Sequence, residues 1–457
     1  MKNPEIKYIT KTPSSYYIAL AAWRRGLHVT FIKNIHNYRI TSTEKSLFFA
    51  TSAMVGGREG LSSHYTCKDK YATKHLLQKN NVPTPEGKLF DQSSAESEIV
   101  SYAEQLGYPV VVKPNNEARG VDVFSRIENR NSLHMALDSI RSKRDVFELI
   151  VEKHIYGDDY GVFVLGEEVI AAYKRTPANV IGDGENTIRE LIKIRNIERK
   201  KNPHLRTRLL KVDEEVKWHI QERSMSLDSV LPKGETLFLR SAANISIGGD
   251  VVAVTDQLPE QIKEVSIKAV KSVPNLANGR VDIIYSEDTC PEGSVLEINS
   301  MALIAGHLYP SSGSPQDVGF KMIDFFFPES TKAKTRNSEM FFNMKTVEKH
   351  FEVFAESDYT LAPAPVNETI RRTAVIHGDF KLPDIKYKIR NEVRRLNLSG
   401  FIKKESSEQI DIVLSGEEAD IELFVEFLEE GRLGVKSFEM INYDKPIVSG
   451  FYIDIDK

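Results

Sequence analysis

Apolar residues recur along this chain of 457 residues with two periods, and the segments with each period predict its helices and strands. Residues 15–25 (SYYIALAAWRR) have the helical period, which Gly26 ends, and the following HVTFIKNI alternates like a short strand. A helix followed by a strand is the order found in doubly wound folds. We therefore expect a small α/β unit over residues 1–60.

A larger α+β region is expected over residues 61–330. It opens with an amphipathic helix in KDKYATKHLLQKNNV, and strand-like runs follow in YPVVVKP, VFELIVEKHI and DYGVFVLGEEVIAAYKR. Gly166 and Glu167 separate two alternating apolar runs, which is typical of a hairpin. Residues 183–235 are helical and strongly charged. Because acids are interspersed among the bases, we interpret this segment as a solvated helical face rather than a nucleic-acid surface.

The end of the chain predicts a linker and a separate domain. Residues 331–370 are polar and contain several prolines, which predicts a linker with one amphipathic stretch. Within residues 371–457, strand TAVIHG precedes helix YKIRNEVRRLNL, and strand QIDIVLSG precedes helix ADIELFVEFLEEG. A final strand pair is expected after them. This is the β-α-β-β-α-β order of the ferredoxin-like fold.

Composition adds a cellular setting to this picture. With 41% hydrophobic and 28% charged residues, the chain is typical of a soluble globular protein. The 61 basic and 65 acidic residues nearly balance, which argues against a nucleic-acid partner. The N-terminal MKNPEIKYITKTPSSYY lacks a signal-peptide core, and no run approaches the ~20 apolar residues of a membrane span. We therefore expect a cytoplasmic protein whose two cysteines, Cys67 and Cys290, are reduced.

One polar cluster is predicted where two strands meet. The run GRVDIIYSEDTCPEGSVLEINSM predicts two antiparallel strands, with Asp282 on the first and Glu297 and Asn299 on the second. Residues two apart on a strand face the same side, so Glu297 and Asn299 project together and Asp282 is able to join them. Two carboxylates and an amide oxygen are ligands that magnesium prefers. On spacing alone, however, an ordinary exposed acidic hairpin is the favoured interpretation.

Other residues, taken in chain order, favour the metal interpretation. Lys113 ends a β-branched run before a loop containing Gly120, so the lysine can reach phosphates while the loop covers them. Upstream, Asp69 and Lys70 open a helix, and downstream the run VEKHI follows a strand as a candidate nucleotide hinge. Each piece alone is a weak signal, since a lysine at a strand end is usually just solvated. Their order along the chain is the stronger signal.

The motifs DK, VVVKP, VEKHI, D and E-x-N, in this order, resemble those of the ATP-grasp family. The sequence is most similar to the branch of cyanophycin synthetase and bifunctional glutathione synthetase. The stretches that carry the likeness are DKYATKHLLQKNNVPTPEG, YKRTPANVIGDGENTIRELI, LDSVLPKGETLFLRSAANISIGGDVVAVTD and VLEINSMALIAGHLYPSSG. The resemblance covers roughly residues 60–330 and implies the ATP-grasp fold, in which two α+β lobes clasp ATP.

The resemblance also implies ligands and a role for each matching residue. The ligands are ATP and magnesium, with manganese as an alternative ion. The implied roles are, in chain order, phosphate contacts at Lys70 and Lys113, adenine contacts at Glu152 and Ile155, a ribose contact at Asp159, phosphoryl stabilisation at Arg240 with Asn244 nearby, and metal ligation by Asp282, Glu297 and Asn299.

The implied reaction is an ADP-forming ligation of small, amino-acid-like substrates. A carboxylate would attack the γ-phosphate to give an acylphosphate, and an amine would then displace phosphate, through positioning and charge neutralisation by the protein. The sequence departs from the family after E-x-N, where SMALIAGH lacks an arginine that helps define the acceptor site. His307 is therefore a candidate substrate contact. Lys174 and Arg175 are either further substrate contacts or a solvated strand edge.

Two further departures limit the analogy. The loop after Lys113, NNEARGVDVF, contains Gly120 alone where the relatives have a glycine-richer loop, so the covering of ATP is expected to differ. The second ligase domain of cyanophycin synthetase has no counterpart in the sequence. We therefore do not expect cyanophycin synthesis.

The last domain, residues 371–457, resembles an acylphosphatase. The family's phosphate-binding arginine falls on Lys386, its water-positioning asparagine falls on Lys404, and the phosphate loop reads HGDFKLPD. Lysine lacks the planar fork of arginine, and it cannot accept a hydrogen bond from water as an asparagine oxygen does. We expect little or no acylphosphatase turnover, and instead a role in dimerisation, substrate gating or docking of a carrier protein.

The sequence thus leaves two classes of function. The first is a carboxylate–amine ligase that acts on small molecules and self-associates, as its relatives commonly do. The alternative is a regulatory protein that binds or hydrolyses acylphosphates through its C-terminal domain.

Overall fold

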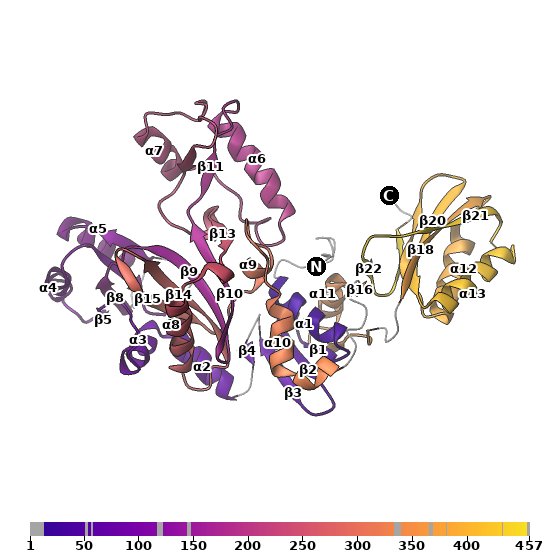
Figure 1. The fold of residues 1–457 in the computed structure, drawn as a ribbon, viewed down its shortest axis with the longest axis horizontal. Helices are drawn as coiled ribbons and strands as arrows, with labels where there is room; N and C mark the ends of the chain where they lie inside the picture. The colour runs from indigo at the N-terminus through magenta and orange to yellow at the C-terminus, as the bar shows by residue number, and fades with distance from the viewer. Residues whose placement is uncertain are drawn as a thin grey trace. The chain divides into compact units, whose positions relative to one another are not determined.

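A computed structural model describes most of the chain and divides it into two compact units. The first unit consists of residues 1–48 and 322–457, and the second of residues 49–321. The described residues, coloured along the chain in Figure 1, are 13–50, 54–55, 58–116, 122–143, 148–332, 340–364, 369–380, 382–431 and 433–454.

The N-terminal part of the first unit is an antiparallel sheet covered by a buried helix. Helix α1 (Pro13–Arg24) is buried along its whole length. Strand β1 (His28–Ile32) pairs antiparallel with β2 (Asn37–Thr41), and β3 (Ser46–Ala50) comes next in the sheet. The predicted helix and strand are therefore present, but the doubly wound arrangement is wrong. A connection as short as the one between β1 and β2 permits only antiparallel pairing.

The segment predicted as a linker, residues 331–370, completes this sheet instead. It contains β16 (Met340–Phe341), α11 (Met344–Val353) and β17 (Asp358–Thr360), after a 3₁₀ turn at Pro328–Lys332. Strand β17 pairs antiparallel with β1, and the indole of Trp23 donates a 2.7 Å hydrogen bond to the carbonyl of Ala362. The sequence did not predict this strand because its polar, proline-containing surroundings are typical of a linker. An edge strand tolerates such residues, since one of its sides is free of neighbours.

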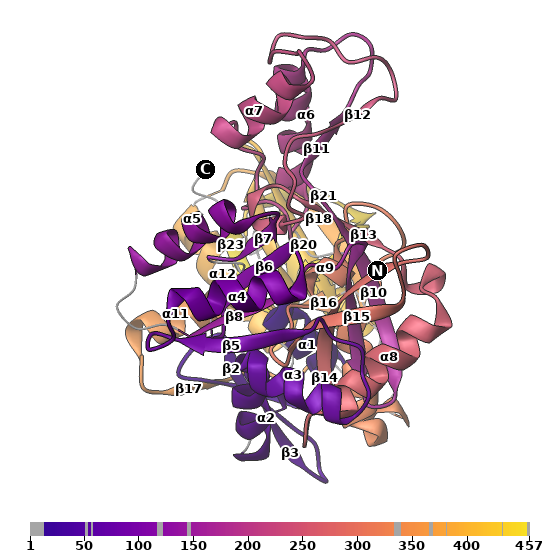
Figure 2. The same cartoon turned by 90° about the vertical axis from the view of Figure 1, so that its left-hand side faces the viewer.

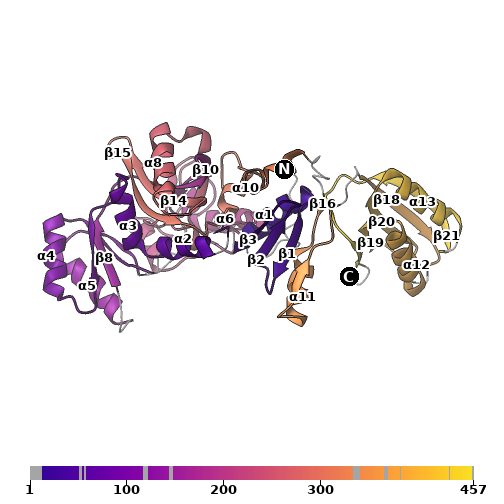
Figure 3. The same ribbon diagram turned by 90° about the horizontal axis from the view of Figure 1, so that it is seen from below.

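The second unit begins with two helices and a small sheet. After β4 (Met54–Val55), α2 (Arg58–Lys68) leads into α3 (Lys70–Lys79). The sheet has the order β5-β8-β6-β7, and helices α4 and α5 lie beside it (Figure 3). The bounds of these elements are Gly87–Asp91 for β5, Glu96–Leu106 for α4, Val110–Pro114 for β6, Phe124–Ile127 for β7, Arg130–Arg141 for α5 and Glu148–Lys153 for β8.

The larger sheet of this unit has the order β13-β10-β9-β14-β15. Its bounds are Asp158–Leu165 for β9, Glu168–Thr176 for β10, Asp250–Ala253 for β13, Asn278–Ser286 for β14 and Cys290–Asn299 for β15. Helix α8 (Glu260–Lys271) packs on one face, and the short helix α9 (Ala305–Leu308) and α10 (Val318–Phe326) follow the sheet. The predicted hairpins β9–β10 and β14–β15 are both confirmed.

A charged insertion leaves this sheet between β10 and β13. It contains β11 (Asn179–Ile181), α6 (Ile188–Lys201), α7 (Glu214–Glu222), β12 (Thr236–Phe238) and a 3₁₀ turn at Ile245–Ile247. A second 3₁₀ turn, Thr255–Gln257, follows β13 outside the insertion. The two helices and two strands of the insertion cluster together in Figure 2. Thr187 forms a reciprocal capping box with Glu190 at the start of α6, which explains why that helix begins there.

The C-terminal domain has the β-α-β-β-α-β order read from the sequence, followed by two extra short strands. Its elements are β18 (Ile370–Gly378), α12 (Leu382–Arg395), β19 (Ser399–Lys404), β20 (Gln409–Gly416), α13 (Glu418–Glu429), β21 (Val435–Asn442), β22 (Ile447–Val448) and β23 (Phe451–Asp454). The sheet order is β21-β18-β20-β19-β23, so β21 and β23 lie at opposite edges. The expected final strand pair is therefore wrong. Across the described residues, no helix is long and apolar enough to cross a membrane.

Candidate functional site

One face of the larger sheet carries a row of charged and amide side chains. The opposite face packs on α8 through an apolar cluster that includes Val162, Val281 and Ile298. Side chains alternate along a strand, so the residues directly before and after these apolar ones point away from α8. The row on the face away from α8 consists of Arg175 on β10, Asp159 on β9, Arg280 and Asp282 on β14, and Glu297 and Asn299 on β15.

Asp282 lies at the centre of this row and is 3% exposed. Its carboxylate accepts from Arg280 Nε at 2.7 Å and from Arg280 Nη2 at 3.2 Å, and it lies 3.1 Å from Arg175 Nη2. Burial raises the pKa of Asp282, but the attraction of Arg175 and Arg280 outweighs burial and holds that pKa below its usual range. Asp282 is therefore ionised at neutral pH.

Glu297 and Asn299 meet Asp282 as the strand spacing predicts. Asp282 lies opposite Glu297 in the β14–β15 register. Asn299 Nδ2 is 3.1 Å from Glu297 Oε1 and 3.3 Å from Asp282 Oδ2, so the tips of all three side chains share one place. The Asn299 amide nitrogen donates to both carboxylates, and turning the amide by 180° would present its oxygen to a cation there. This hard-oxygen donor set fits a magnesium ion.

Asp159 is linked to the same cluster through Arg175. Arg175 Nη2 lies 2.6 Å from Asp159 Oδ1, so one guanidinium bridges Asp159 and Asp282. Burial raises the pKa of Asp159 to about 6, against the opposing effect of Arg175 and with a smaller contribution from Asp282. The structure therefore brings together Arg175 and Asp159, which the sequence placed in different roles.

A second ionic cluster lies in the smaller lobe. Glu152, 2% exposed, accepts from Lys113 Nζ at 2.5 Å and from Lys74 Nζ at 2.7 Å. Burial raises the pKa of Glu152, but the two ammonium groups outweigh it and the pKa is lowered. A carboxylate has about four acceptor positions, so Glu152 can still accept from a purine amino group. Lys74 had no place in the sequence-based site, although it lies one helical turn after Lys70.

Lys70 is anchored by Asn115, which lies two residues after Lys113 in the chain. Lys70 Nζ donates to the carbonyl of Asn115 at 3.3 Å, and the side chain of Asn115 accepts from the backbone of Tyr71 at 2.9 Å. Asp69 caps α3, as expected, and also accepts from Asn115 Nδ2 at 3.1 Å. Asn115 was missed because an asparagine after a strand is a common loop residue. The loop glycine predicted to cover phosphates, Gly120, lies outside the described residues.

Arg240 and Asn244 sit in the insertion, with local partners of their own. Arg240 is ion-paired with Asp213 at 2.5 Å and with Glu215, and its Nε donates to the carbonyl of Ile247. Asn244 caps the turn that follows by accepting from the backbone of Ser246 at 2.9 Å. The guanidinium groups that touch Asp282 are instead those of Arg175 and Arg280.

The predicted substrate residue His307 is buried rather than open to solvent, with 1% exposure. Its ring packs against Tyr173 with centroids 4.6 Å apart, and against the edge of Phe163 at 5.9 Å. The other candidate, Lys174, points away from the row because it alternates with Arg175, and it pairs with Asp158 at 2.5 Å.

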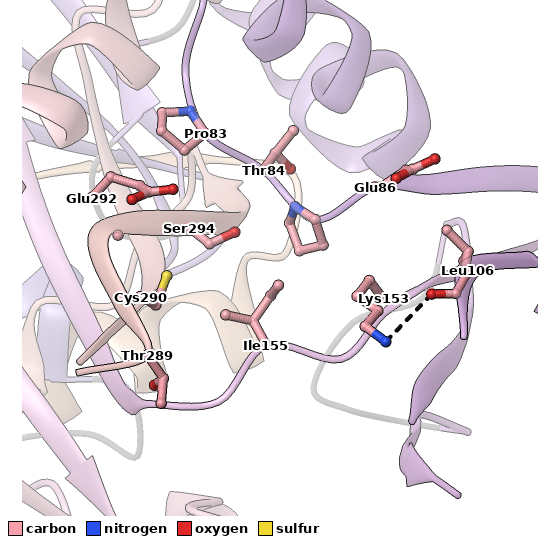
Figure 4. A pocket seen from close by; sticks show the side chains of 12 residues that line it. Pro83, Thr84, Glu86, Leu106, Lys153, Ile155, Thr289, Cys290, Glu292 and Ser294 are labelled. Carbon is pink, nitrogen blue, oxygen red and sulfur yellow. Dashed lines mark hydrogen bonds between the residues drawn. The ribbon is translucent and has the colours of Figure 1, made fainter. Parts of the chain in front are cut away.

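Ile155 follows β8 and lines a pocket of about 410 Å³ beside the hinge. Figure 4 shows Pro83 and Thr84 on one side of this pocket, Ile155 and Lys153 on the other, and Ser294 from β15. Lys153 alternates with Glu152 and donates to the carbonyl of Gly107 at 2.6 Å. The side chain of Ile155 therefore lies on the hinge face opposite Glu152, and an adenine contact would fall to its backbone.

Two α+β lobes joined by a hinge, with buried lysines on one and a hard-oxygen cluster on the other, define the architecture of an ATP-grasp protein. Residues 67–186 match the RimK-like ATP-grasp domain family. The chain therefore contains a RimK-like ATP-grasp domain, and the predicted fold of this region is confirmed.

Relatives support the same assignment. The chain is 28% identical over 322 residues to the glutathione biosynthesis bifunctional protein of Clostridium perfringens, covering 69% of this chain and 41% of that protein. It is 31% identical over 281 residues to cyanophycin synthetase of Crocosphaera subtropica, covering 58% and 31%. The crystal structure of a bifunctional glutathione synthetase from Pasteurella multocida superposes with a TM-score of 0.50 at 24% identity, covering 64% of this chain and 41% of that one. The chain thus spans less than half of each relative.

Proposed function

We propose that this protein is an ADP-forming carboxylate–amine ligase that acts on small amino-acid-like substrates through an acylphosphate. The observation that carries the proposal is the convergence of Asp282, Glu297 and Asn299 at one point of the sheet, in a domain with buried lysines across the hinge. The relatives are named for biosynthetic ligations, which supports the same reaction class.

The proposed roles follow the geometry where contacts support them. Lys70 and Lys113 would hold ATP phosphates, with Glu152 keeping Lys113 in place as its buried counter-ion. Adenine would lie at the hinge beside Glu152 and the backbone of Ile155, and Asp159 would accept from the ribose. Asp282, Glu297 and Asn299 would hold magnesium, or manganese. Such an ion would supply positive charge that neutralises the phosphates.

The proposed chemistry needs no nucleophile from the protein. A substrate carboxylate oxygen attacks the γ-phosphorus, the bond to the bridging oxygen breaks, and ADP leaves with an acylphosphate formed. An amine then attacks the acyl carbon, loses a proton, and releases phosphate. Arg175 would orient the carboxylate, and Arg240 with Asn244 would act on phosphoryl oxygens if the insertion carries them to the site. The chain's own work is positioning and charge stabilisation.

The proposal is tested by nucleotide binding and by phosphate release. The protein is expected to bind ATP with magnesium, and Asp282→Asn is expected to weaken that binding at least tenfold. Phosphate release is expected only when a carboxylate and an amine are both present. A protein that binds no ATP with magnesium contradicts the proposal.

The C-terminal domain motivates a second proposal. Its β-α-β-β-α-β order agrees with an acylphosphatase-like fold, yet Lys386 and Lys404 stand where that family has arginine and asparagine. We infer that this domain docks a partner, such as a carrier protein or a second copy of the chain, rather than hydrolysing acylphosphates. Robust hydrolysis of acetyl phosphate by residues 371–457 would support the alternative function instead.

A further inference from the structure

The pocket beside Ile155 lies behind the hinge, on the side away from Glu152. On β8, Val151 packs with α4 and α5, so Glu152 points to the opposite face and Lys153 points to the α4 side again. There Lys153 donates to the carbonyl of Gly107 at 2.6 Å, just after α4 ends. Because Lys153 and the last residue of α4 both line the pocket, it is separate from the proposed nucleotide site. We call it the rear pocket.

Both connections between the two lobes line the rear pocket, as Figure 4 shows. The first, residues 83–86, joins α3 to β5, and the second, which includes Ile155, joins β8 to β9. Leu106 at the end of α4 contributes one wall, and Cys290 and Ser294 on β15 contribute another. A ligand in the rear pocket would therefore contact both lobes and both connections. The volume of about 410 Å³ is within the usual range for small-molecule sites, roughly 300–1,000 Å³.

One buried hydroxyl in the wall of the rear pocket lacks a partner. Ser294 is 5% exposed, and its side chain makes no hydrogen bond among the described residues. Figure 4 shows this hydroxyl pointing from β15 into the space between Thr84 and Ile155. The hydroxyl of Thr84, by contrast, donates to the carbonyl of Val295 at 2.9 Å. Buried polar groups are nearly always satisfied, so the hydroxyl of Ser294 is available to a group from outside the chain.

The charges around the rear pocket are negative on balance. Glu86 and Glu292 line it, and neither carboxylate forms an ion pair among the described residues. The lining contains one cation, Lys153, within the part of the chain that the structure describes, and its ammonium donates to the carbonyls of Gly107 and, at 3.4 Å, Leu106. These carbonyls lie at the C-terminal end of α4, where a helix carries partial negative charge that offsets the lysine. The rear pocket therefore favours a cation over an anion.

The charge of Glu292 also acts on the wall of the pocket. Cys290 is 7% exposed, and burial raises the pKa of its thiol. Glu292 raises that pKa further, so its negative charge acts at the buried wall and not only in the surrounding solvent. Pro83 and Pro85 add apolar surface to the same pocket. A ligand with a positive group and an apolar body matches this combination.

We propose that the rear pocket binds a small organic cation, an amine or a guanidine with an apolar body, and that this ligand opposes the binding of ATP. The cationic group pairs with Glu292 and donates to the hydroxyl of Ser294, whose oxygen has lone pairs to accept it. Glu86 adds negative charge from the first connection. The apolar body lies against Pro83 and Pro85.

The opposition to ATP follows from the position behind the hinge. Closing the lobes on a nucleotide in front of the hinge rotates them about the two connections and moves the walls of the rear pocket apart. A cation that contacts both walls loses contacts in this movement. Each ligand therefore lowers the affinity for the other by the same factor. This coupling rests on the proposed ligase function, whereas the cation site does not.

The first experiment measures binding to the whole protein without nucleotide. Phenethylamine is the cationic probe, and phenethyl alcohol and phenylacetate are its neutral and anionic counterparts, each titrated by ligand-observed NMR at pH 7.5. We expect phenethylamine to bind at least tenfold more tightly than phenylacetate and at least threefold more tightly than the alcohol. Equal affinities for the three probes, or no saturable binding of phenethylamine, would overturn the site.

The two cysteines locate the bound probe without any mutation. Cys290 lines the rear pocket, whereas Cys67 is equally buried and lies outside it. Saturating phenethylamine is expected to slow alkylation of Cys290 by iodoacetamide at least threefold and to leave the rate at Cys67 unchanged. Mass spectrometry of the labelled peptides supplies both rates. Equal effects at the two thiols would overturn the assignment to this pocket.

Variants assign the preference for a cation to particular side chains. Glu292→Gln and Ser294→Ala are each expected to weaken phenethylamine binding at least fivefold, and Glu292→Gln should change the affinity for phenethyl alcohol less than twofold. Glu287→Gln is the matched control, because it removes an exposed acid from the same β14–β15 turn but outside the pocket. Its affinity for phenethylamine should equal that of the wild type. Unchanged binding in folded Glu292→Gln overturns the proposal.

Titration of ATP with magnesium tests the coupling. Saturating phenethylamine is expected to raise the Kd for ATP at least threefold in the wild type and in Glu287→Gln, but less than twofold at the same concentration in Glu292→Gln. An unchanged Kd for ATP while phenethylamine is bound overturns the coupling. A wild type that binds no ATP with magnesium overturns the ligase function, and the cation measurements then still decide the site.

Discussion

Asp282 receives two guanidinium groups on one carboxylate while Glu297 and Asn299 approach it from the neighbouring strand. A cation bound there would compete with Arg280 and Arg175 for the same oxygens. Each interaction is strong because the group is buried and the local dielectric is low. The site is therefore a set of buried charges, each in contact with a group of opposite charge, so a change at one residue alters the others. The cluster around Glu152 is built in the same way.

Glu152→Gln tests that balance in the smaller lobe. The substitution would leave Lys74 and Lys113 buried without a carboxylate, and breaking such a cluster costs about 3–5 kcal/mol. We expect a marked fall in the free energy of unfolding, measured by urea denaturation at pH 7.5. Glu128→Gln removes an exposed partner of Arg126 and is expected to change stability by less than about 1 kcal/mol. Equal midpoints for the two variants would contradict this prediction.

His307 predicts a specific dependence of stability on pH. Its folded pKa is about 3, below the unfolded value near 6.5, so unfolding takes up a proton when the pH falls below 6.5. The stability present above that value is then lost toward pH 3, with a slope of about 1.4 kcal/mol per pH unit for one proton.

His307→Phe should therefore have a shallower loss of stability than the wild type between pH 6.5 and pH 4.5. Urea midpoints across that range supply the measurement. His75→Phe, which changes an exposed histidine, should leave the slope as in the wild type. Parallel curves for wild type and His307→Phe would show that His307 is not held neutral by burial.

At the scale of elements, the insertion is attached to the sheet through one buried acid. Asp250, 3% exposed at the start of β13, pairs with Arg199 at 2.7 Å and with Arg195 at 2.8 Å, both on α6. It also accepts from Ser311 Oγ at 3.0 Å, in the segment that follows the metal ligands. Helix α6, β13 and that segment are thus held together by this acid.

Asp250→Asn is expected to loosen this junction. Removing one charge leaves Arg199 buried without its counter-ion, so the amide hydrogens of α6 should exchange much faster and the melting temperature should fall. Hydrogen exchange followed by mass spectrometry measures the effect on residues 188–201. Glu214→Gln, an exposed change on α7 of the same insertion, serves as the control and should leave exchange in α6 unchanged.

At the scale of the whole molecule, segments far apart in sequence complete the N-terminal sheet. Strand β17 covers the edge of β1, and the hydroxyl of Tyr16 donates to the carbonyl of Phe342 at 3.1 Å. Residues after 330 are therefore part of the first sheet rather than a spacer. Removing them would leave the edge of β1 and the buried face of α1 without cover, which favours aggregation.

Truncation tests this organisation directly. A chain ending at residue 364 retains β16, α11 and β17, whereas one ending at residue 330 retains none of them. We expect the longer chain to be soluble with a cooperative thermal transition, and the shorter one to be largely insoluble. Equal soluble yield and melting temperature of the two chains would show that β17 contributes nothing to the sheet.

Sequence patterns predicted much of the local structure, because periodicity and turn residues act over a few positions. They placed the β9–β10 and β14–β15 hairpins, the start of α3 at Asp69, and the common face of Glu297 and Asn299. Resemblance to a family supplied the ATP-grasp fold of the central region, which the family match confirms. These statements need only neighbours in sequence or a shared order of motifs.

Tertiary structure alone decided which distant side chains meet. The contacts of Arg175 and Arg280 with Asp282, the burial of Lys74 against Glu152, and the pairing of Arg199 with Asp250 depend on strand register and on the path of the insertion. The assignment of β17 to the first sheet has the same origin. No local pattern encodes such contacts, because their free energy comes from packing between segments that the sequence separates by tens to hundreds of residues.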